Sequence, residues 1–194
     1  MDSPFLVVIA MKEESQGLFE KDGVQVLYTG LGKVNATYHL TRALTERRAL
    51  DRPVKAVFNF GTAGSFTFAT HSLVECNGFV QRDMDVSALG IPQGVTPFES
   101  IPKKITMPQR LSLTTGTCGT GDRFETSKPI VECDVVDMEA YAFAKICWLE
   151  KIPFVAVKYI TDGSDHNAHN DWQANLPFAA KAFVGAYKDL ISLF

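Results

Sequence analysis

The sequence predicts a single α/β domain over residues 1–194, and three observations lead to this prediction. Continuous apolar runs rich in β-branched and aromatic residues recur along the chain, as in strands that are covered on both faces. Segments with apolar residues at helical spacing lie between these runs. The length and composition agree, because 194 residues with 46% hydrophobic and 21% charged side chains can bury one sizeable core.

The first half of the chain is expected to contain strands and one helix. Short apolar runs predict the strands, and apolar residues at helical spacing after the Thr29–Gly32 turn predict the helix, which ends before Pro53. In chain order the expected elements are a strand at 5–10, a strand at 24–28, a helix at 33–50, a strand at 56–60 and a strand at 72–81.

The second half begins with a long segment, residues 88–110, that is rich in proline and glycine. Loops of this length usually carry function. Pro153 marks the end of a further helix, and a polar stretch separates the last strand from the last helix. The expected elements are a strand at 111–117, a strand at 131–136, a helix at 137–151, a strand at 154–160 and a helix at 176–193.

Acidic residues stand at or near the ends of several predicted elements. They are Glu14, Asp122, Glu139 and Asp162. A carboxylate beside buried strands is costly to desolvate without partners, so several of them together indicate a polar site. Open α/β sheets generally bind ligands at the edge where the strands end. Taken singly, each position is weak evidence, because Glu139 in the first turn of a helix is also explained by the helix dipole and Asp162 by capping of the next element.

Charge and hydropathy exclude several classes of partner. Nineteen Lys and Arg against 22 Asp and Glu give a net charge of −3, which does not suit binding to nucleic acid or to an anionic membrane. No apolar run approaches the roughly 20 residues that span a bilayer. The early run at 5–11 has neither the positive residues nor the cleavage site of a signal peptide. We therefore expect a cytoplasmic protein with a small-molecule or protein partner.

The glycine-rich turn at residues 30–33 matches neither of two known phosphate-binding motifs. Gly30-x-Gly32 begins like a dinucleotide fingerprint, but Asn35 stands where a third Gly or Ala would allow close helix packing. A P-loop is excluded as well, because Val34 follows Lys33 where Ser or Thr would be needed to reach magnesium.

Metal, disulfide and serine-nucleophile chemistry are not indicated. His166 and His169 lie three apart beside acidic residues, but no predicted helix holds them on one face, and we expect no metal there. The chain contains no G-x-S-x-G elbow. The cysteines form no C-x-x-C pair and are expected to be reduced and mostly buried; they are Cys76, Cys118, Cys133 and Cys147.

Six short segments, spread over nearly the whole chain, together resemble a known family in their order and spacing. This is the purine nucleoside phosphorylase/nucleosidase superfamily, and the resemblance is greatest to its 5'-methylthioadenosine/S-adenosylhomocysteine nucleosidase branch. It implies a central mixed, twisted sheet flanked by helices and hydrolysis of the N-glycosidic bond of a 5'-thio-substituted adenosine. The segments are residues 10–14 (AMKEE), 29–36 (TGLGKVNA), 60–64 (FGTAG), 121–124 (GDRF), 136–140 (VDMEA) and 158–165 (KYITDGSD).

The resemblance assigns the catalytic roles to two carboxyl groups. Asp162 matches the family's general acid, which protonates N7 of the leaving adenine, and it must keep its proton near neutral pH. Glu14 matches the residue that orients and deprotonates the attacking water, as in inverting glycosidases. Two carboxyl groups with different protonation states would then carry the reaction.

The same resemblance implies the binding residues. Glu139 would accept hydrogen bonds from the ribose hydroxyls, with Met138 packed beneath the ribose, and Phe124 and Glu125 would meet the base. Without the resemblance, Phe124 and Met138 would be expected to be core residues. The remaining candidates are Met11, Leu31 and Trp172 around the 5'-substituent, Thr62, Ala63 and Gly64 in the turn that meets the water or a phosphate, and Lys158.

This chain departs from the family pattern in three ways. It is shorter than typical members, between Glu14 and Thr29 and again between Asp122 and Asp137. Lys158 stands where arginine is commoner in bacterial members, and Glu125 replaces an aliphatic residue.

The family usually forms homodimers in which a neighbouring subunit closes the 5' pocket, so we expect a homodimer. The implied chemistry requires no cofactor and no metal.

Three other functions remain open. A phosphorylase of the same fold would need several cationic donors for phosphate, and Glu14 would repel that anion; the cations in or beside the motifs are Lys33, Arg82, Arg123 and Lys158. A futalosine hydrolase would also act on a purine nucleoside with a modified 5' side. A binding protein without catalysis is the third alternative, although the three carboxyl residues are all present.

Overall fold

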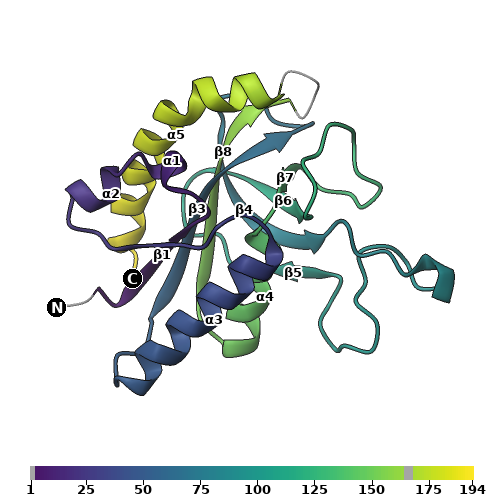
Figure 1. The fold of residues 1–194 in the computed structure, drawn as a ribbon, viewed down its shortest axis with the longest axis horizontal. Helices are drawn as coiled ribbons and strands as arrows, with labels where there is room; N and C mark the ends of the chain where they lie inside the picture. Colours follow the sequence, from purple (N-terminus) through teal and green to yellow (C-terminus); the bar gives the residue numbers. More distant parts are fainter. Residues whose placement is uncertain (1–2, 164–167) are drawn as a thin grey trace.

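A mixed β-sheet forms the centre of the fold (Figure 1). The structure is a computed structural model that describes residues 3–163 and 168–194. The strands within these ranges pair in the order β2-β1-β3-β7-β6-β4-β5, and β8 pairs with both β3 and β4. Their bounds are β1 Phe5–Ile9, β2 Val26–Tyr28, β3 Ala56–Ser65, β4 Leu73–Gln81, β5 Lys104–Thr106, β6 Thr114–Thr120, β7 Val135–Asp137 and β8 Phe154–Asp162.

Part of the sheet closes on itself because β3 pairs with three strands along its length. Its first residues pair in parallel with β1, residues 57–64 pair in parallel with β8, and its last two residues pair with β7 in antiparallel orientation. From β8 the ladder continues through β4, β6 and β7 back to β3. A closed ring of five strands therefore joins the ends of β3, β7 and β8 in one place.

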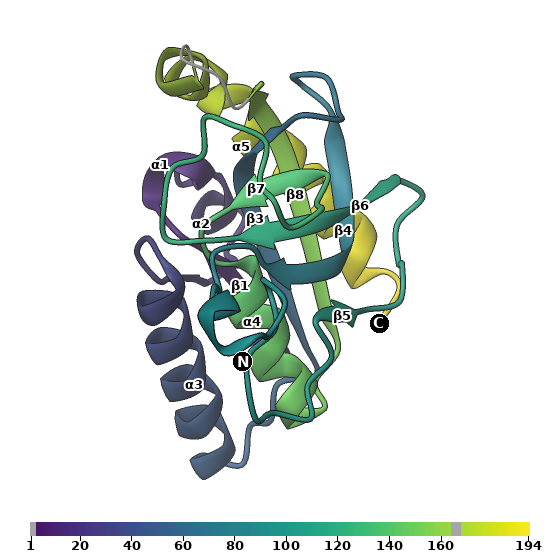
Figure 2. The same cartoon turned by 90° about the vertical axis from the view of Figure 1, so that its right-hand side faces the viewer.

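Helices cover both faces of the sheet, which explains the continuous apolar runs. Figures 1 and 2 show α3 and α4 on one side and α5 with α1 and α2 on the other. In β1, Leu6 and Val8 join the core on the α3 and α4 side, and Val7 and Ile9 join the core beneath α5. The helices are α1 Lys12–Ser15, α2 Leu18–Lys21, α3 Lys33–Ala49, α4 Ala140–Glu150 and α5 Ala168–Ile191, with a 3₁₀ turn at Ser87–Leu89.

Most of the predicted elements are confirmed, and the differences lie mainly at their ends. The helix expected at 33–50 and the strand expected at 72–81 match α3 and β4 closely. The strand expected at 111–117 is displaced to β6, because Glu75 accepts hydrogen bonds from the backbone N–H groups of Arg110 and Leu111. β3 and β8 extend beyond the predicted strands, since their small and polar ends still pair with each other.

Three short elements and one long helix differ from the expectations. The short helices α1 and α2 and the strand β5 were not predicted, and β5 lies within the segment 88–110 that was expected to be a loop. The final helix begins at Ala168 instead of residue 176 and contains Pro177. Its first turns are polar, so apolar periodicity did not reveal them.

All four cysteines are free thiols, as expected, and three of them are buried. Within the described ranges, the structure contains no helix with the length and apolar character needed to cross a bilayer. The histidine pair considered as a metal site, His166 and His169, lies outside the residues whose side chains the structure describes.

Candidate active site

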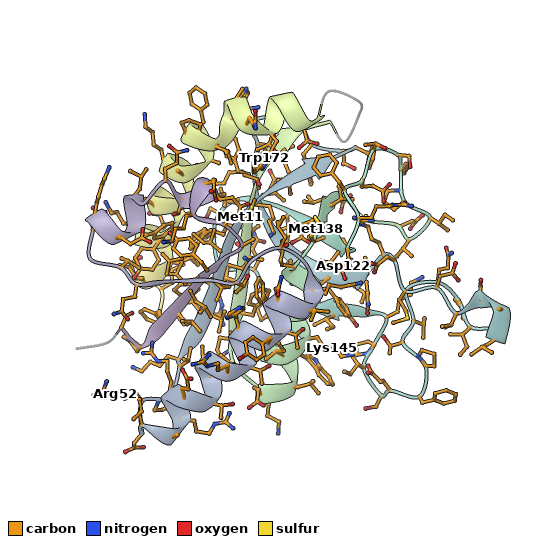
Figure 3. The ribbon with its side chains drawn as sticks, viewed as in Figure 1. Met11, Arg52, Asp122, Met138, Lys145 and Trp172 are labelled. Carbon is orange, nitrogen blue, oxygen red and sulfur yellow. The ribbon has the colours of Figure 1, made fainter. Side chains whose placement is uncertain are left out.

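A cavity of about 250 Å³ lies where β3, β7 and β8 end, and nearly all the predicted site residues line it. Figure 3 shows Met11, Met138 and Trp172 approaching the same region from three separate segments. Lys158 and Asp122 are the candidates absent from the lining. The predicted residues that line the cavity are Met11, Glu14, Leu31, Thr62, Ala63, Gly64, Phe124, Glu125, Met138, Glu139, Asp162 and Trp172.

Glu14 is buried in α1 and tied to the end of β3. Its Oε1 atom accepts hydrogen bonds from Thr62 N and Thr62 Oγ1, each at 2.7 Å. Its Oε2 atom accepts one from Met11 N at 3.2 Å. Burial raises the pKa of Glu14 above its usual value, although these donors and the charge of Lys158 act in the opposite direction. The result is a fixed carboxyl group with an increased proton affinity.

Thr62 connects Glu14 to the last helix. Its Oγ1 atom donates to Glu14 and accepts a hydrogen bond from Trp172 Nε1 at 3.0 Å. The hydroxyl of Thr62 thus helps to orient Glu14, and its predicted contact with a water or a phosphate stays a prediction. The indole of Trp172, which was expected near the 5'-substituent, also lines the cavity.

Glu139 immediately precedes α4 and faces the glycine turn that precedes α3. Its Oε1 atom accepts a hydrogen bond from Gly32 N at 2.8 Å. Gly32 has a φ of 90°, a conformation that favours glycine. Burial, and then the negative charge of Asp137, raise the pKa of Glu139 to about 8. Glu139 therefore holds its proton more tightly than a solvent-exposed glutamate does.

Lys158 lies beneath the cavity and neutralises one of its carboxylates. Its Nζ atom is 2.8 Å from Asp137 Oδ2, and both side chains are almost fully buried. Burial opposes both charges, but their mutual attraction outweighs it, so the pKa of Asp137 is lowered and that of Lys158 is raised. Asp137 also accepts hydrogen bonds from Thr120 Oγ1 and Ala140 N. Sequence reasoning did not assign Asp137, although it belongs to the quoted VDMEA segment.

Asp162 is the last residue of β8 and is 4% exposed. The register between β3 and β8 shifts at this point: Ala63 pairs with Ile160, whereas Gly64 pairs with Asp162. Such a bulge re-aims side chains at the end of a strand. Asp162 Oδ2 accepts a hydrogen bond from Thr161 Oγ1 at 2.8 Å, and Asn175 of α5 donates to the carbonyl of Thr161. The acid is thus positioned by local bonds at the cavity wall.

The far side of the cavity is formed by the loop after β6. Phe124 lines the cavity with 52% of its surface exposed, so little packing surrounds it. Next to it, Glu125 is buried and forms an ion pair with Arg82 at 2.6 Å. Sequence reasoning named Arg82 only as a possible phosphate donor. No pattern in a single sequence indicates that this arginine pairs with a residue 43 positions away.

Comparison with known proteins finds relatives of this chain over most of its length. Residues 4–192 match the profile of the phosphorylase superfamily. A 5'-methylthioadenosine/S-adenosylhomocysteine nucleosidase from a Geobacillus species is 31% identical, over 95% of this chain and 87% of the relative. An aminodeoxyfutalosine nucleosidase from Helicobacter pylori is 27% identical, over 91% and 83% respectively. The native structure of futalosine hydrolase from Helicobacter pylori superposes with a TM-score of 0.83 at 23% identity, covering 98% of this chain and 97% of that one.

Proposed function

Because the chain belongs to the phosphorylase superfamily, we propose that it is a nucleosidase that hydrolyses the N-glycosidic bond of a purine nucleoside. The preferred substrates are 5'-methylthioadenosine or S-adenosylhomocysteine, and the products are adenine and the 5'-thio-substituted ribose. The observation that carries this proposal is the pair of buried acidic residues, Glu14 and Asp162, in one cavity. Burying two carboxyl groups beside one hollow is costly, and such clusters are typical of sites that bind a polar ligand.

The proposed reaction divides the work between these two carboxyl groups. The bond between C1' of the ribose and N9 of adenine breaks, and its electron pair remains with the base. Asp162 gives its proton to N7, so the base leaves neutral. A water attacks C1' and passes a proton to Glu14. The raised pKa of Glu14 supports the role of base, because a carboxylate with a higher proton affinity accepts a proton more readily.

The remaining lining residues are proposed to hold the substrate. Glu139 binds the ribose hydroxyls, with Met138 beneath the sugar, and Phe124 stacks on the adenine. Met11, Leu31 and Trp172 surround the 5'-substituent, and the turn at Thr62, Ala63 and Gly64 borders the attacking water. Their presence in one cavity supports these roles. Lys158 acts indirectly, through its ion pair with Asp137.

Hydrolysis is favoured over phosphorolysis by the contacts of Glu14. A phosphate placed at the Thr62 turn would face the carboxyl group of Glu14. The backbone N–H and the hydroxyl of Thr62 already donate hydrogen bonds to Glu14. A phosphate at this turn would therefore lack these two donors and would be repelled by the acidic group of Glu14. A water, by contrast, can donate to Glu14.

The proposal is tested by measuring base release with and without phosphate. Methylthioadenosine, S-adenosylhomocysteine, futalosine, adenosine and inosine are incubated separately in phosphate-free buffer containing excess chelator, and the products are separated by chromatography. We expect adenine from methylthioadenosine without phosphate. Base release that requires phosphate would replace the hydrolase by a phosphorylase, and binding without release would replace it by a binding protein. Preferential cleavage of futalosine would reassign the 5' group.

We also propose that the protein is a homodimer and acts in the cytoplasm. Apolar side chains are exposed beside the cavity, where α3 begins: Leu31 is 48%, Val34 is 77% and Tyr38 is 57% exposed. Val34 and Tyr38 are four residues apart in α3 and lie on one face of it, and Leu31 precedes the helix; a second copy of the chain would cover these side chains. Four free cysteines suit a reducing compartment.

A further inference from the structure

The loop that carries Phe124 is held by an arginine outside that loop. Arg82 follows directly after β4, and its guanidinium contacts four residues of the neighbouring segment. Its Nε donates to Gly119 O at 3.2 Å, its Nη2 to Gly121 O at 3.3 Å and to Arg123 O, and its Nη1 to Glu125 Oε2 at 2.6 Å. All three guanidinium nitrogens therefore donate hydrogen bonds to one segment, either to its backbone carbonyls or to the carboxylate of Glu125.

These contacts fall on alternate residues. The odd-numbered positions from 119 to 125 bind the guanidinium of Arg82. Phe124 lies between two of them and lines the cavity together with Arg82, Arg123 and Glu125. Phe124 is half exposed, so packing alone does not define where its ring lies. The backbone on either side of the ring must define it instead. Arg82 contacts this backbone and side chain on both sides of Phe124, at Arg123 and Glu125.

Asp83, the residue after Arg82, links the same loop to the segment around the turn that contacts Glu139. Asp83 Oδ2 accepts a hydrogen bond from Asp122 N at 2.9 Å, and Asp83 Oδ1 pairs with Lys33 Nζ. Asp122 Oδ1 in turn accepts one from Lys33 N at 2.8 Å. Asp83 thereby ties the loop after β6 to the start of α3, next to the contacts that Arg82 makes with the same loop.

The approach of the guanidinium to the loop is too close for a side chain at position 121. A Cβ atom on Gly121 would lie 2.8 Å from Arg82 Cζ and 3.1 Å from Asp83 Cγ. A side chain at position 121 would therefore displace the guanidinium of Arg82 from its present position. The side chains of Arg82 and Glu125 are each only 3% exposed, so the pair is shielded from water and does not exchange readily for solvent contacts.

We infer that Arg82 and Asp83 form a clamp that fixes the loop of residues 121–125 and so positions Phe124 to receive the purine base. The inference rests on the proposed function. Arg82 acts as a positioning residue, because its donors are directed to the loop. A fixed loop lowers the ordering cost of binding the base in the ground state and in the transition state alike, so the clamp should act on KM more than on kcat.

The test compares Arg82→Lys and Gly121→Ala with the wild type. Lysine keeps a positive charge opposite Glu125 but lacks the planar fork that reaches several acceptors, and Gly121→Ala displaces an intact arginine. The control is Arg48→Lys, which alters an exposed ion pair with Glu150 remote from the cavity lining. Steady-state kinetics with methylthioadenosine, calorimetric titration with adenine, and amide hydrogen exchange of residues 119–130 are measured for all four proteins.

Both clamp variants are expected to raise KM about tenfold or more while kcat falls less than about threefold, since a hydrogen bond to a charged group is worth roughly a factor of ten. Adenine affinity should fall by a similar factor, and exchange at 119–125 should accelerate about tenfold. The control should match the wild type in all three. Unchanged exchange in that loop, or an unchanged KM and adenine affinity, would overturn the inference.

The hydrogen-exchange arm keeps the clamp separate from the proposed function. If the wild type cleaves no nucleoside, the proposed function fails, but loop protection still decides whether Arg82 holds residues 121–125. If the wild type cleaves the nucleoside and the variants lose only thermal stability at an unchanged KM, the function stands and the clamp fails.

Discussion

Glu14, Glu139 and Asp162 share one cavity but have different partners. Glu14 is surrounded by donors from Thr62 and Met11, Glu139 faces one backbone N–H and a neighbouring carboxylate, and Asp162 bonds to the adjacent hydroxyl. Different environments give acidic groups different proton affinities, which is how one site can hold an acid and a base at the same pH. At the residue scale, the proposed mechanism depends on this separation.

Replacing the proposed acid should stop catalysis without unfolding the protein. Asp162→Asn keeps the size of the side chain and its ability to accept from Thr161, but it has no proton to donate to N7. We expect base release to fall by about 10²–10⁴-fold, the usual contribution of a positioned general acid. The assay is chromatographic adenine release, with circular dichroism as the check on folding. Asp51→Asn, at an exposed turn, is the matched control. Full activity in the Asp162 variant would remove Asp162 from the mechanism.

The high pKa of Glu139 predicts a pH-dependent cost to stability. The folded protein keeps this proton up to about pH 8, whereas an unfolded glutamate loses it near 4.5, so unfolding releases a proton between these values. The wild type should therefore lose stability relative to Glu139→Gln as the pH rises from 5 to 8, with a slope of at most about 1.4 kcal/mol per pH unit. Urea unfolding at each pH measures this, with exposed Glu13→Gln as control. A difference that stays constant with pH would contradict the raised pKa.

At the scale of elements, β8 supplies both the buried cation and the proposed acid. Lys158 points to Asp137 at the base of the cavity, and Asp162 ends the same strand beyond the bulge. β7 brings Asp137 beside it and is followed immediately by Met138 and Glu139. Two short stretches of chain thus set the charges on one wall of the site.

Removing the buried cation should destabilise the fold strongly. Lys158→Met leaves Asp137 buried without its partner, which costs about 3–5 kcal/mol in comparable pairs. Urea unfolding should show this loss at pH 7. The control, Lys188→Met, breaks an exposed pair with Asp22 and should cost less than about 1 kcal/mol. Equal losses in the two variants would mean that the Lys158–Asp137 pair has no special structural role.

Sequence patterns predicted the elements that have strong periodicity and missed those that depend on distant contacts. α3 and β4 were found because their apolar residues repeat regularly and turn residues bound them. β6 was misplaced because a side chain of β4, Glu75, bonds the backbone ahead of it. At the site, family motifs led to Glu14 and Asp162. Arg82 had no such motif, and its role depends on a loop that only the fold brings close.

At the scale of the molecule, ring closure gathers residues from the whole chain. The cavity draws on residue 10 at one end of the sequence and residue 172 at the other. Because β3, β4, β6, β7 and β8 pair in a closed circuit, these segments cannot separate without breaking a ladder. The opening beside Leu31 and Phe124 is the less protected side, since both side chains are about half exposed.

The proposed homodimer predicts a mass in solution of twice 21.4 kDa. Light scattering after size exclusion measures it. Val34→Glu should shift the protein to monomers, because it places a charge in the centre of the exposed apolar face. Leu50→Glu, at the other end of α3 and also exposed, should leave the dimer intact. A monomeric wild type would contradict the assembly.

The most direct test of the central claim is the source of the new oxygen on the sugar. Methylthioadenosine is cleaved in phosphate-free buffer made with ¹⁸O-labelled water, and the released methylthioribose is analysed by mass spectrometry immediately after a brief reaction. Glu14 and Asp162 acting as base and acid on one nucleoside predict one labelled oxygen at C1, at a rate that Asp162→Asn abolishes. A sugar without label, or a sugar phosphate formed only when phosphate is added, would contradict hydrolysis at this site.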